Sequence, residues 1–245
     1  MQKFATTLRL TIALLALGAS MAFAQVLVPE SLEHGQDVEI SMFGEQGRTP
    51  HSVNVAGIVY DNTASPAVGA FSSTSLASVW GDELLMISGG ILSQHKLAIY
   101  NSSSSLGALL TANIQVSFYD GATATFIGSY TSSINFGTGL AKGSYSILTI
   151  TGIDALNYNL PADVIVLQTI TSKTGMANRL GFVSLDPPTV GSSDIDFYAN
   201  STTVGAAGWY TLSGINTNLA HQITVLSPPV PTKTSSWGRI KSLYR

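Results

Sequence analysis

Four carboxylates in two short motifs are the first candidates for a metal site. Asp82 and Glu83 are adjacent, and Asp194 and Asp196 are separated by one residue. Because side chains alternate along an extended segment, Asp194 and Asp196 point to the same side. Together with Asp82 or Glu83 and backbone carbonyls, they could supply the roughly six to eight oxygen ligands that Ca²⁺ takes. The alternative is that they make only turn and cap hydrogen bonds, because the chain has no EF-hand or repeat-type calcium motif.

Three aromatic residues in the same stretches of sequence, Trp80, Tyr198 and Trp209, are candidates for ligand binding. Their rings offer a large apolar surface with a polar edge, which suits stacking against sugar rings. Aromatic side chains are also what the core of a β-sandwich is built from, so core packing is the competing interpretation.

Catalytic patterns are weak in this chain. The four histidines, His34, His51, His95 and His221, are scattered and form no HxH or HExxH pattern, so we expect surface or strand residues rather than a zinc site. No Gly-x-Ser-x-Gly elbow occurs, and the chain has no cysteine. Glycoside hydrolysis needs two carboxylates that face each other, which sequence spacing does not show. We therefore expect a non-enzymatic protein without catalytic residues, with no cofactor other than calcium.

Composition narrows the class of protein further. The 245 residues are 45% hydrophobic and only 10% charged, and the formal net charge is −3. The chain is too apolar for a disordered polyelectrolyte and too poor in Lys and Arg for a nucleic-acid binder. A surface wetted mainly by Ser, Thr, Asn and Gln is typical of extracellular β-rich proteins.

The elements that would position these residues are expected to be short β-strands. The clearest alternation runs through residues 114–119, and the following Asp120-Gly121 predicts a type I′ hairpin turn before a strand at 123–130. Similar runs separated by Gly, Ser, Asn, Asp or Pro predict further strands at 38–43, 52–60, 84–88, 96–100, 145–150, 164–170, 180–183, 209–212 and 222–226.

These short runs predict an all-β, two-sheet β-sandwich of the jelly-roll kind over residues 51–226. No window sustains a helical apolar face for three turns, and the spacing does not fit βαβ units. An outer-membrane barrel is the competing architecture, and the expected short strands and irregular aromatic positions disfavour it. Residues 25–50 mix charges with Gly and Pro and are expected to form an N-terminal arm.

Both ends of the chain are interpreted as localisation elements. Lys3 and Arg9 precede an apolar run at 10–17, and a small-x-small pattern ends at Ala24, so residues 1–24 are predicted to be a cleaved signal peptide. No other stretch is long enough for a transmembrane helix. At the other end, the Pro-rich segment 227–231 is a stiff spacer before a basic, aromatic tail. Its recognition residues would be Trp237, Gly238, Arg239, Ile240 and Tyr244. A frayed terminus without function is the alternative.

Five short sequence motifs follow one another along the chain: IVYDNT from residue 58, WGDEL from 80, VSFYDG from 116, LDPPTVGSSDIDFY from 185 and GWYTL from 208. Together they resemble a family of uncharacterised secreted β-sandwich domains from environmental bacteria, often found in proteins with PEP-CTERM or other surface-sorting signals. The resemblance implies an exported, surface-associated domain and no established catalytic residues. The tail has neither a Val-Pro-Glu-Pro motif nor an apolar span, so a different tail-reading machinery is expected.

The sequence thus predicts a secreted or cell-surface bacterial module with a structural or adhesive role. The alternative is a secreted carbohydrate-binding jelly roll with a structural calcium ion. The expected partners are a cell-surface or glycan ligand and sorting machinery for the tail, and no nucleic acid.

Overall fold

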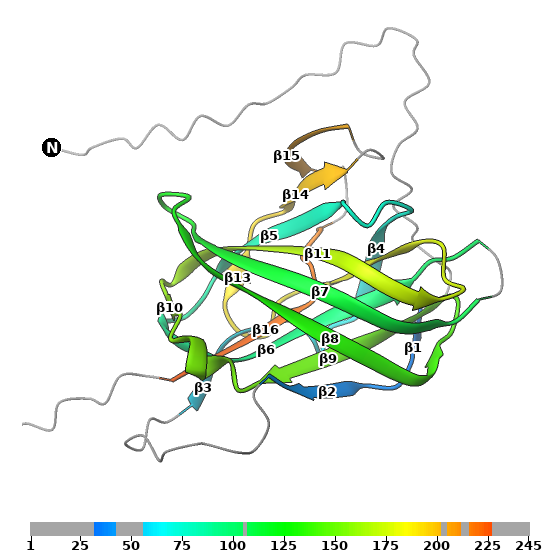
Figure 1. Ribbon diagram of the computed structural model, residues 1–245. Helices are drawn as coiled ribbons and strands as arrows, with labels where there is room; N and C mark the ends of the chain where they lie inside the picture. Colours follow the sequence, from blue (N-terminus) through cyan, green and yellow to red (C-terminus); the bar gives the residue numbers. More distant parts are fainter. Residues whose placement is uncertain (1–31, 43–55, 105–106, 202–204, 212–215, 227–245) are drawn as a thin grey trace, which may run out of the picture.

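The computed structural model describes residues 32–42, 56–104, 107–201, 205–211 and 216–226, which form two β-sheets packed face to face (Figure 1). The predicted signal peptide at 1–24, the segment 43–55 with His51, and the tail at 227–245 lie outside the described residues. The prediction of an all-β sandwich is confirmed. In the described residues, no helix is long and apolar enough to cross a membrane.

The first sheet has nine strands. Its main path runs β1-β9-β6-β12-β4, β2 pairs with β9, β10 and β16 pair with β6, and β3 pairs with β16. The strands are β1 (Glu33–His34), β2 (Val38–Ser41), β3 (Ala56–Asp61), β4 (Ala67–Ser73), β6 (Gly90–Asn101), β9 (Ser144–Thr151), β10 (Asn159–Leu160), β12 (Leu180–Leu185) and β16 (His221–Leu226).

The second sheet has seven strands in the order β15-β14-β5-β11-β7-β8, with β13 paired to β5. They are β5 (Val79–Leu85), β7 (Leu109–Asp120), β8 (Phe126–Leu140), β11 (Asp163–Gly175), β13 (Ser192–Ser193), β14 (Asp196–Ser201) and β15 (Gly205–Thr211). A single 3₁₀ turn, η1 (Ile153–Leu156), is described between β9 and β10. The chain changes sheets at most of its connections, as chains do in jelly-roll sandwiches.

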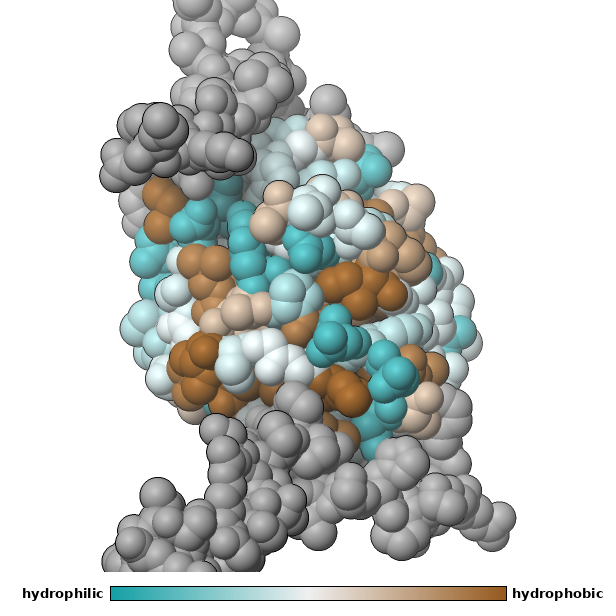
Figure 2. Space-filling view, turned by 90° about the vertical axis from the view of Figure 1, so that its left-hand side faces the viewer, coloured by the Kyte–Doolittle hydropathy of each residue, from teal (hydrophilic) through white to brown (hydrophobic). Residues whose placement is uncertain are grey.

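Alternating side chains fill the space between the sheets. On β7, Ile114, Val116 and Phe118 are fully buried, whereas the residues between them face outward, as the sequence pattern predicts. Because period-2 alternation places one set of side chains on one face, each strand contributes a row of apolar residues to a common core. On the end of the sandwich shown in Figure 2, apolar patches are separated by polar side chains.

The predicted hairpin exists between β7 and β8, but its turn is different from the prediction. The loop spans residues 121–125, and the residue with positive φ is Ala124, not Asp120 or Gly121. The Asp120 carboxylate accepts hydrogen bonds from the backbone and hydroxyl of Thr123. Gly121 has no positive φ, and the Asp163 carboxylate lies where a Cβ at this position would be.

Several strands are longer than predicted. β6 has 12 residues, β11 has 13 and β8 has 15. Inward alternation continues through Ser132 in β8, whereas the exposed end of β11 is held by its pairing with β7. β4 and β14, which are rich in Ser, Gly, Ala or Asn, were not predicted. From the expected arm, β1 and β2 join the nine-stranded sheet through parallel pairing with β9.

Candidate functional site

A pair of aromatic side chains, one exposed and one half-buried, marks the outer face of the seven-stranded sheet. Tyr198 on β14 lies directly opposite Trp209 on β15, and their ring centroids are 5.8 Å apart at 73°. Phe197 and Ala199 point into the core, so alternation turns Tyr198 outward. Trp209 keeps 40% of its surface exposed. Two of the three predicted aromatic residues therefore meet on an accessible surface, on the hairpin at the top of Figure 1.

A glycine on the neighbouring strand shapes the surface beside this pair. Tyr198 is paired with Gly81 of β5, which in turn is paired with Leu167 of β11. A Cβ at Gly81 would overlap Cδ2 of Leu167, lie 2.8 Å from the carbonyl oxygen of Val166 and lie 3.4 Å from Cβ of Tyr198. The missing side chain allows Tyr198 and Leu167 to lie close together over β5.

Acidic side chains continue the same outer face. Glu83 follows Gly81 by two residues on β5, and Asp163 of β11 and Asp194 and Asp196 near β14 act on it electrostatically. Burial raises the pKa of Glu83, and the charges of these three carboxylates raise it further, to about 7. With a pKa of about 7, Glu83 is about half ionised at neutral pH, and the neighbouring carboxyl groups make the face beside Tyr198 acidic.

Asp82 points to the opposite side of β5, into the space between the sheets. It is fully buried, and its two oxygens accept hydrogen bonds from the Ser193 hydroxyl and the Leu219 backbone N–H, each at 2.9 Å. Burial raises the pKa of Asp82 well above its usual range, although these hydrogen bonds oppose the shift. Asp82 and Glu83 thus belong to different environments, because neighbouring residues on a strand face opposite ways.

The predicted calcium ligands are only partly brought together. Asp194 and Asp196 act electrostatically on Glu83, whereas Asp82 is fully buried on the other side of β5. Among the described residues, no group of three or more His, Asp or Glu side chains is arranged to hold a metal ion. A calcium site at these positions stays a prediction.

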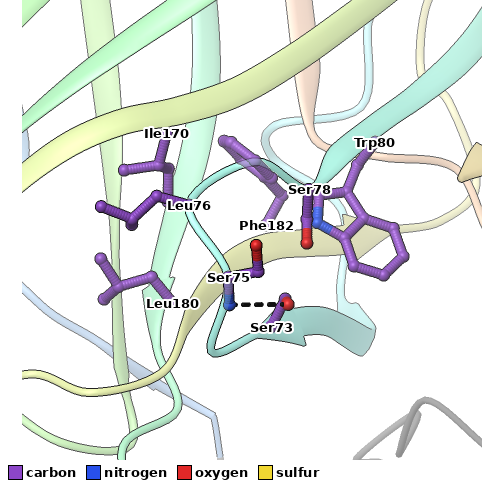
Figure 3. Close-up of a pocket in the computed structure, with 8 residues that line it drawn as sticks. All are labelled: Ser73, Ser75, Leu76, Ser78, Trp80, Ile170, Leu180 and Phe182. Carbon is purple, nitrogen blue, oxygen red and sulfur yellow. Dashed lines mark hydrogen bonds between the residues drawn. The ribbon is translucent and has the colours of Figure 1, made fainter. Parts of the chain in front are cut away.

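Trp80 belongs to the core. It is 1% exposed and packs against Phe71 and Phe197, with ring centroids 5.6 and 6.3 Å away. It therefore cannot stack against a ligand on the outer surface. Trp80 also lines a small pocket at the β4–β5 connection (Figure 3). Its space is about that of one water molecule, far below the roughly 300 Å³ of typical ligand sites, and the other lining residues are Ser73, Ser75, Leu76, Ser78, Ile170, Leu180 and Phe182.

Two histidines form a buried pair that the sequence did not indicate. His95 of β6 and His221 of β16 have no exposed surface, and Nε2 of His95 lies 2.9 Å from Nδ1 of His221. Nδ1 of His95 lies 2.6 Å from the hydroxyl of Tyr130, across the sandwich on β8. Burial lowers the pKa of His221 to about 3, and burial together with His221 lowers that of His95 well below its usual range. Both rings are therefore neutral at physiological pH.

Of the remaining predicted residues, His34 has a structural role, and the tail residues lie outside the described part of the chain. His34 contacts the Asp37 carboxylate at 2.7 Å and stacks on Tyr145, which holds β1 against β9. The proposed tail residues, Trp237, Gly238, Arg239, Ile240 and Tyr244, lie outside the described residues.

The buried side chain of Asn62 connects several of the sequence motifs named above. The Asn62 amide donates to the carbonyl oxygens of Leu185 and Leu219, at 2.7 and 2.9 Å, and its side-chain oxygen accepts from the His221 backbone N–H at 2.7 Å. Asp82 bonds to the same segment through the Leu219 N–H. The motifs that begin at residues 58, 80 and 185 thus contribute residues to buried hydrogen bonds that connect strands, since a buried polar group must find partners.

No protein-family model, curated protein or solved structure matches this chain.

Proposed function

We propose that this chain is a non-enzymatic adhesive module that binds glycans through the outer face of its seven-stranded sheet. The observation that carries the proposal is the pairing of Tyr198 with the exposed Trp209 beside the carboxylates around Glu83. Aromatic faces supply stacking area with little conformational cost, and carboxylates accept hydrogen bonds from sugar hydroxyls.

A binding role fits this surface better than hydrolysis. The carboxylates gather around Glu83 on one open sheet face, whereas glycoside hydrolysis uses two carboxyl groups placed on either side of the scissile bond. The fully buried Asp82 already accepts two protein hydrogen bonds and faces the core. The arrangement offers contacts for a sugar but no pair of groups across a cleft.

Action at a bacterial cell surface is the second part of the proposal. It is supported by the residues at both ends of the chain, namely the signal-peptide pattern at 1–24 and the Pro-rich spacer with its basic tail at 227–245. The resemblance to secreted, surface-sorted sandwich domains supports the same location. The tail would then anchor the module while the outer sheet face contacts the ligand.

The test of glycan binding is a glycan array probed with the full mature chain and with two variants. Trp209→Ala removes half of the aromatic pair, and Met176→Ala removes a still more exposed apolar side chain that directly follows the C-terminal end of β11. The proposal expects that Trp209→Ala loses the bound glycans while Met176→Ala keeps them, with circular dichroism unchanged in both. An array that gives no signal, or equal signals for Trp209→Ala and the parent chain, overturns it.

A further inference from the structure

The charge around the Tyr198–Trp209 pair restricts the class of glycan. Glu83 and Asp163 come from β5 and β11, and Asp194 and Asp196 come from the segment that leads into β14. On the outer face, Asp196 lies two residues from Tyr198 along β14, and Glu83 lies two residues from Gly81, the strand partner of Tyr198. Glu83 is thus the diagonal neighbour of Tyr198 across the two strands. Such neighbours are roughly 7–8 Å apart, which is within reach of long side chains and of one bound sugar unit.

Basic side chains are placed elsewhere in the described part of the chain. Lys96 lies on β6 of the other sheet, and Arg179 donates to the hydroxyl of Ser72. Lys142 donates to the Ser104 carbonyl, and Lys173 is ten residues from Asp163 along β11. The charges that act on Glu83 are all carboxylates. Among the described residues, the outer face beside the aromatic pair is thus acidic, and the four basic side chains lie elsewhere.

An exposed Trp paired with a half-buried Tyr, next to carboxylates, is suited to a positively charged group. Ammonium groups are attracted to the faces of Trp and Tyr by the ring quadrupole, and neighbouring carboxylates add Coulomb attraction. Carboxylated or sulfated sugars would meet like charges, which disfavour binding and act against the wrong partner.

We infer that the outer face of the seven-stranded sheet binds polysaccharides that carry amino groups, and discriminates against acidic polysaccharides. The inference rests on the proposed function, because it concerns the same site and names the class of ligand. In the complex, a sugar ring stacks on Trp209, and its ammonium group lies between the aromatic pair and the carboxylates of Glu83 and Asp196.

Beads coated with polymers of one backbone and different charge test this inference. One series is neutral hydroxyethyl cellulose, its quaternary-ammonium derivative and carboxymethyl cellulose, and the second is dextran with its diethylaminoethyl and carboxymethyl derivatives. Measured at about 0.15 M salt, where distant charges are screened, the cationic member of at least one series should bind about tenfold more tightly than the neutral member. The anionic members should not bind.

Variants separate the site from general charge attraction. Glu83→Gln/Asp196→Asn should reduce the cationic preference about tenfold, whereas Glu39→Gln/Asp154→Asn, which removes two charges from β2 and η1, should leave it unchanged. Trp209→Ala should weaken binding to both the neutral and the cationic polymer. Because the quaternary ammonium keeps its charge at every pH, binding to that polymer should also strengthen between pH 6 and pH 8 as Glu83 ionises.

The outcomes distinguish the two proposals. Equal, Trp209-dependent binding to neutral and cationic polymers overturns the inference on amino groups and leaves glycan binding intact. Binding to cationic polymers that does not depend on Trp209, or that the control variant reduces equally, is general charge attraction and contradicts both. Polylysine beads provide the last comparison, because tighter, Trp209-dependent binding to polylysine would assign the face to a basic peptide instead of a polysaccharide.

Discussion

His95 and His221, 126 residues apart in the sequence, share one hydrogen bond of 2.9 Å in the sealed space between the two sheets. Burial lowers the pKa of both rings, so the folded state keeps them neutral while the unfolded state protonates them near pH 6.5. The buried Asp82 and the partly buried Glu83 have raised pKa values and act in the opposite direction. Two histidines and two carboxyl groups therefore have opposite effects on how the free energy of unfolding depends on pH.

The first prediction concerns the histidines. Below pH 6.5 the unfolded chain binds two more protons on His95 and His221, which lowers stability by up to about 1.4 kcal/mol per pH unit for each ring. The extra protons that the folded chain holds on Asp82 and Glu83 oppose this loss, so the free energy of unfolding should fall less on acidification than the two histidines alone require. Substituting His221→Gln should remove one histidine contribution, and the loss of stability on acidification should then be smaller than in the parent chain. Urea unfolding at several pH values measures this, and a variant curve parallel to that of the parent chain would contradict it.

The second prediction concerns Asp82. A carboxyl with a raised pKa contributes stability below its unfolded pKa of about 3.9 and loses it as pH rises toward the folded value. Asp82→Asn keeps the shape and stays neutral, with its oxygen able to accept from Leu219 and its amide able to donate to Ser193. The variant should therefore be more stable than the parent chain at pH 8 and should lose stability on acidification below pH 6.5.

Asp154→Asn is the matched control for Asp82, because it makes the same change at η1. It should leave the pH profile of unfolding as it is in the parent chain. An Asp82→Asn chain that is less stable at pH 8 than at pH 5 by the same amount as the parent chain would show that Asp82 is ionised when folded.

A third prediction links packing to the aromatic pair. Gly81→Ala would force Leu167 and Tyr198 apart and bring a methyl group to 2.8 Å from the Val166 carbonyl oxygen. We expect a loss of about 1–3 kcal/mol of stability and weaker glycan binding, although position 81 itself carries no ligand-binding side chain. Gly57→Ala, where no atom lies within 4 Å of the added Cβ, is the control for both chemical denaturation and bead binding. Unchanged binding by a folded Gly81→Ala chain would place the ligand elsewhere.

A fourth prediction concerns the location of the protein. Truncation after Pro231 removes the basic, aromatic tail but leaves all described strands in place. Fractionation of cells that make each form should find the full-length protein on the surface and the truncated one in the medium, with equal melting temperatures. Mass determination of the mature chain then shows where either end is processed. Surface retention of the truncated form would refute a role of the tail in sorting.

Local pattern predicted some elements correctly and could not predict others. The alternation at Ile114, Val116 and Phe118 was sufficient to assign β7 and its inner face, because period-2 side-chain direction is a local property. β14 was missed because its polar residues resemble a loop and become a strand only through pairing with β5 and β15. The Asp120-Gly121 signal predicted the right hairpin and the wrong turn, since the loop spans residues 121–125 and its positive φ falls on Ala124.

The sequence by itself determined the fold class and the set of residues able to bind a ligand, because strand alternation and side-chain chemistry are local. Tertiary structure alone decided which of them act together. Trp80 and Trp209 are the same residue type in similar phrases, yet strand pairing turns one into the core and leaves the other exposed. The same alternation separates Asp82 from Glu83, and the pairing of β6 with β16 joins two histidines that are distant in sequence. Contacts of this range depend on register and on sheet packing, which neighbouring residues in the chain do not specify.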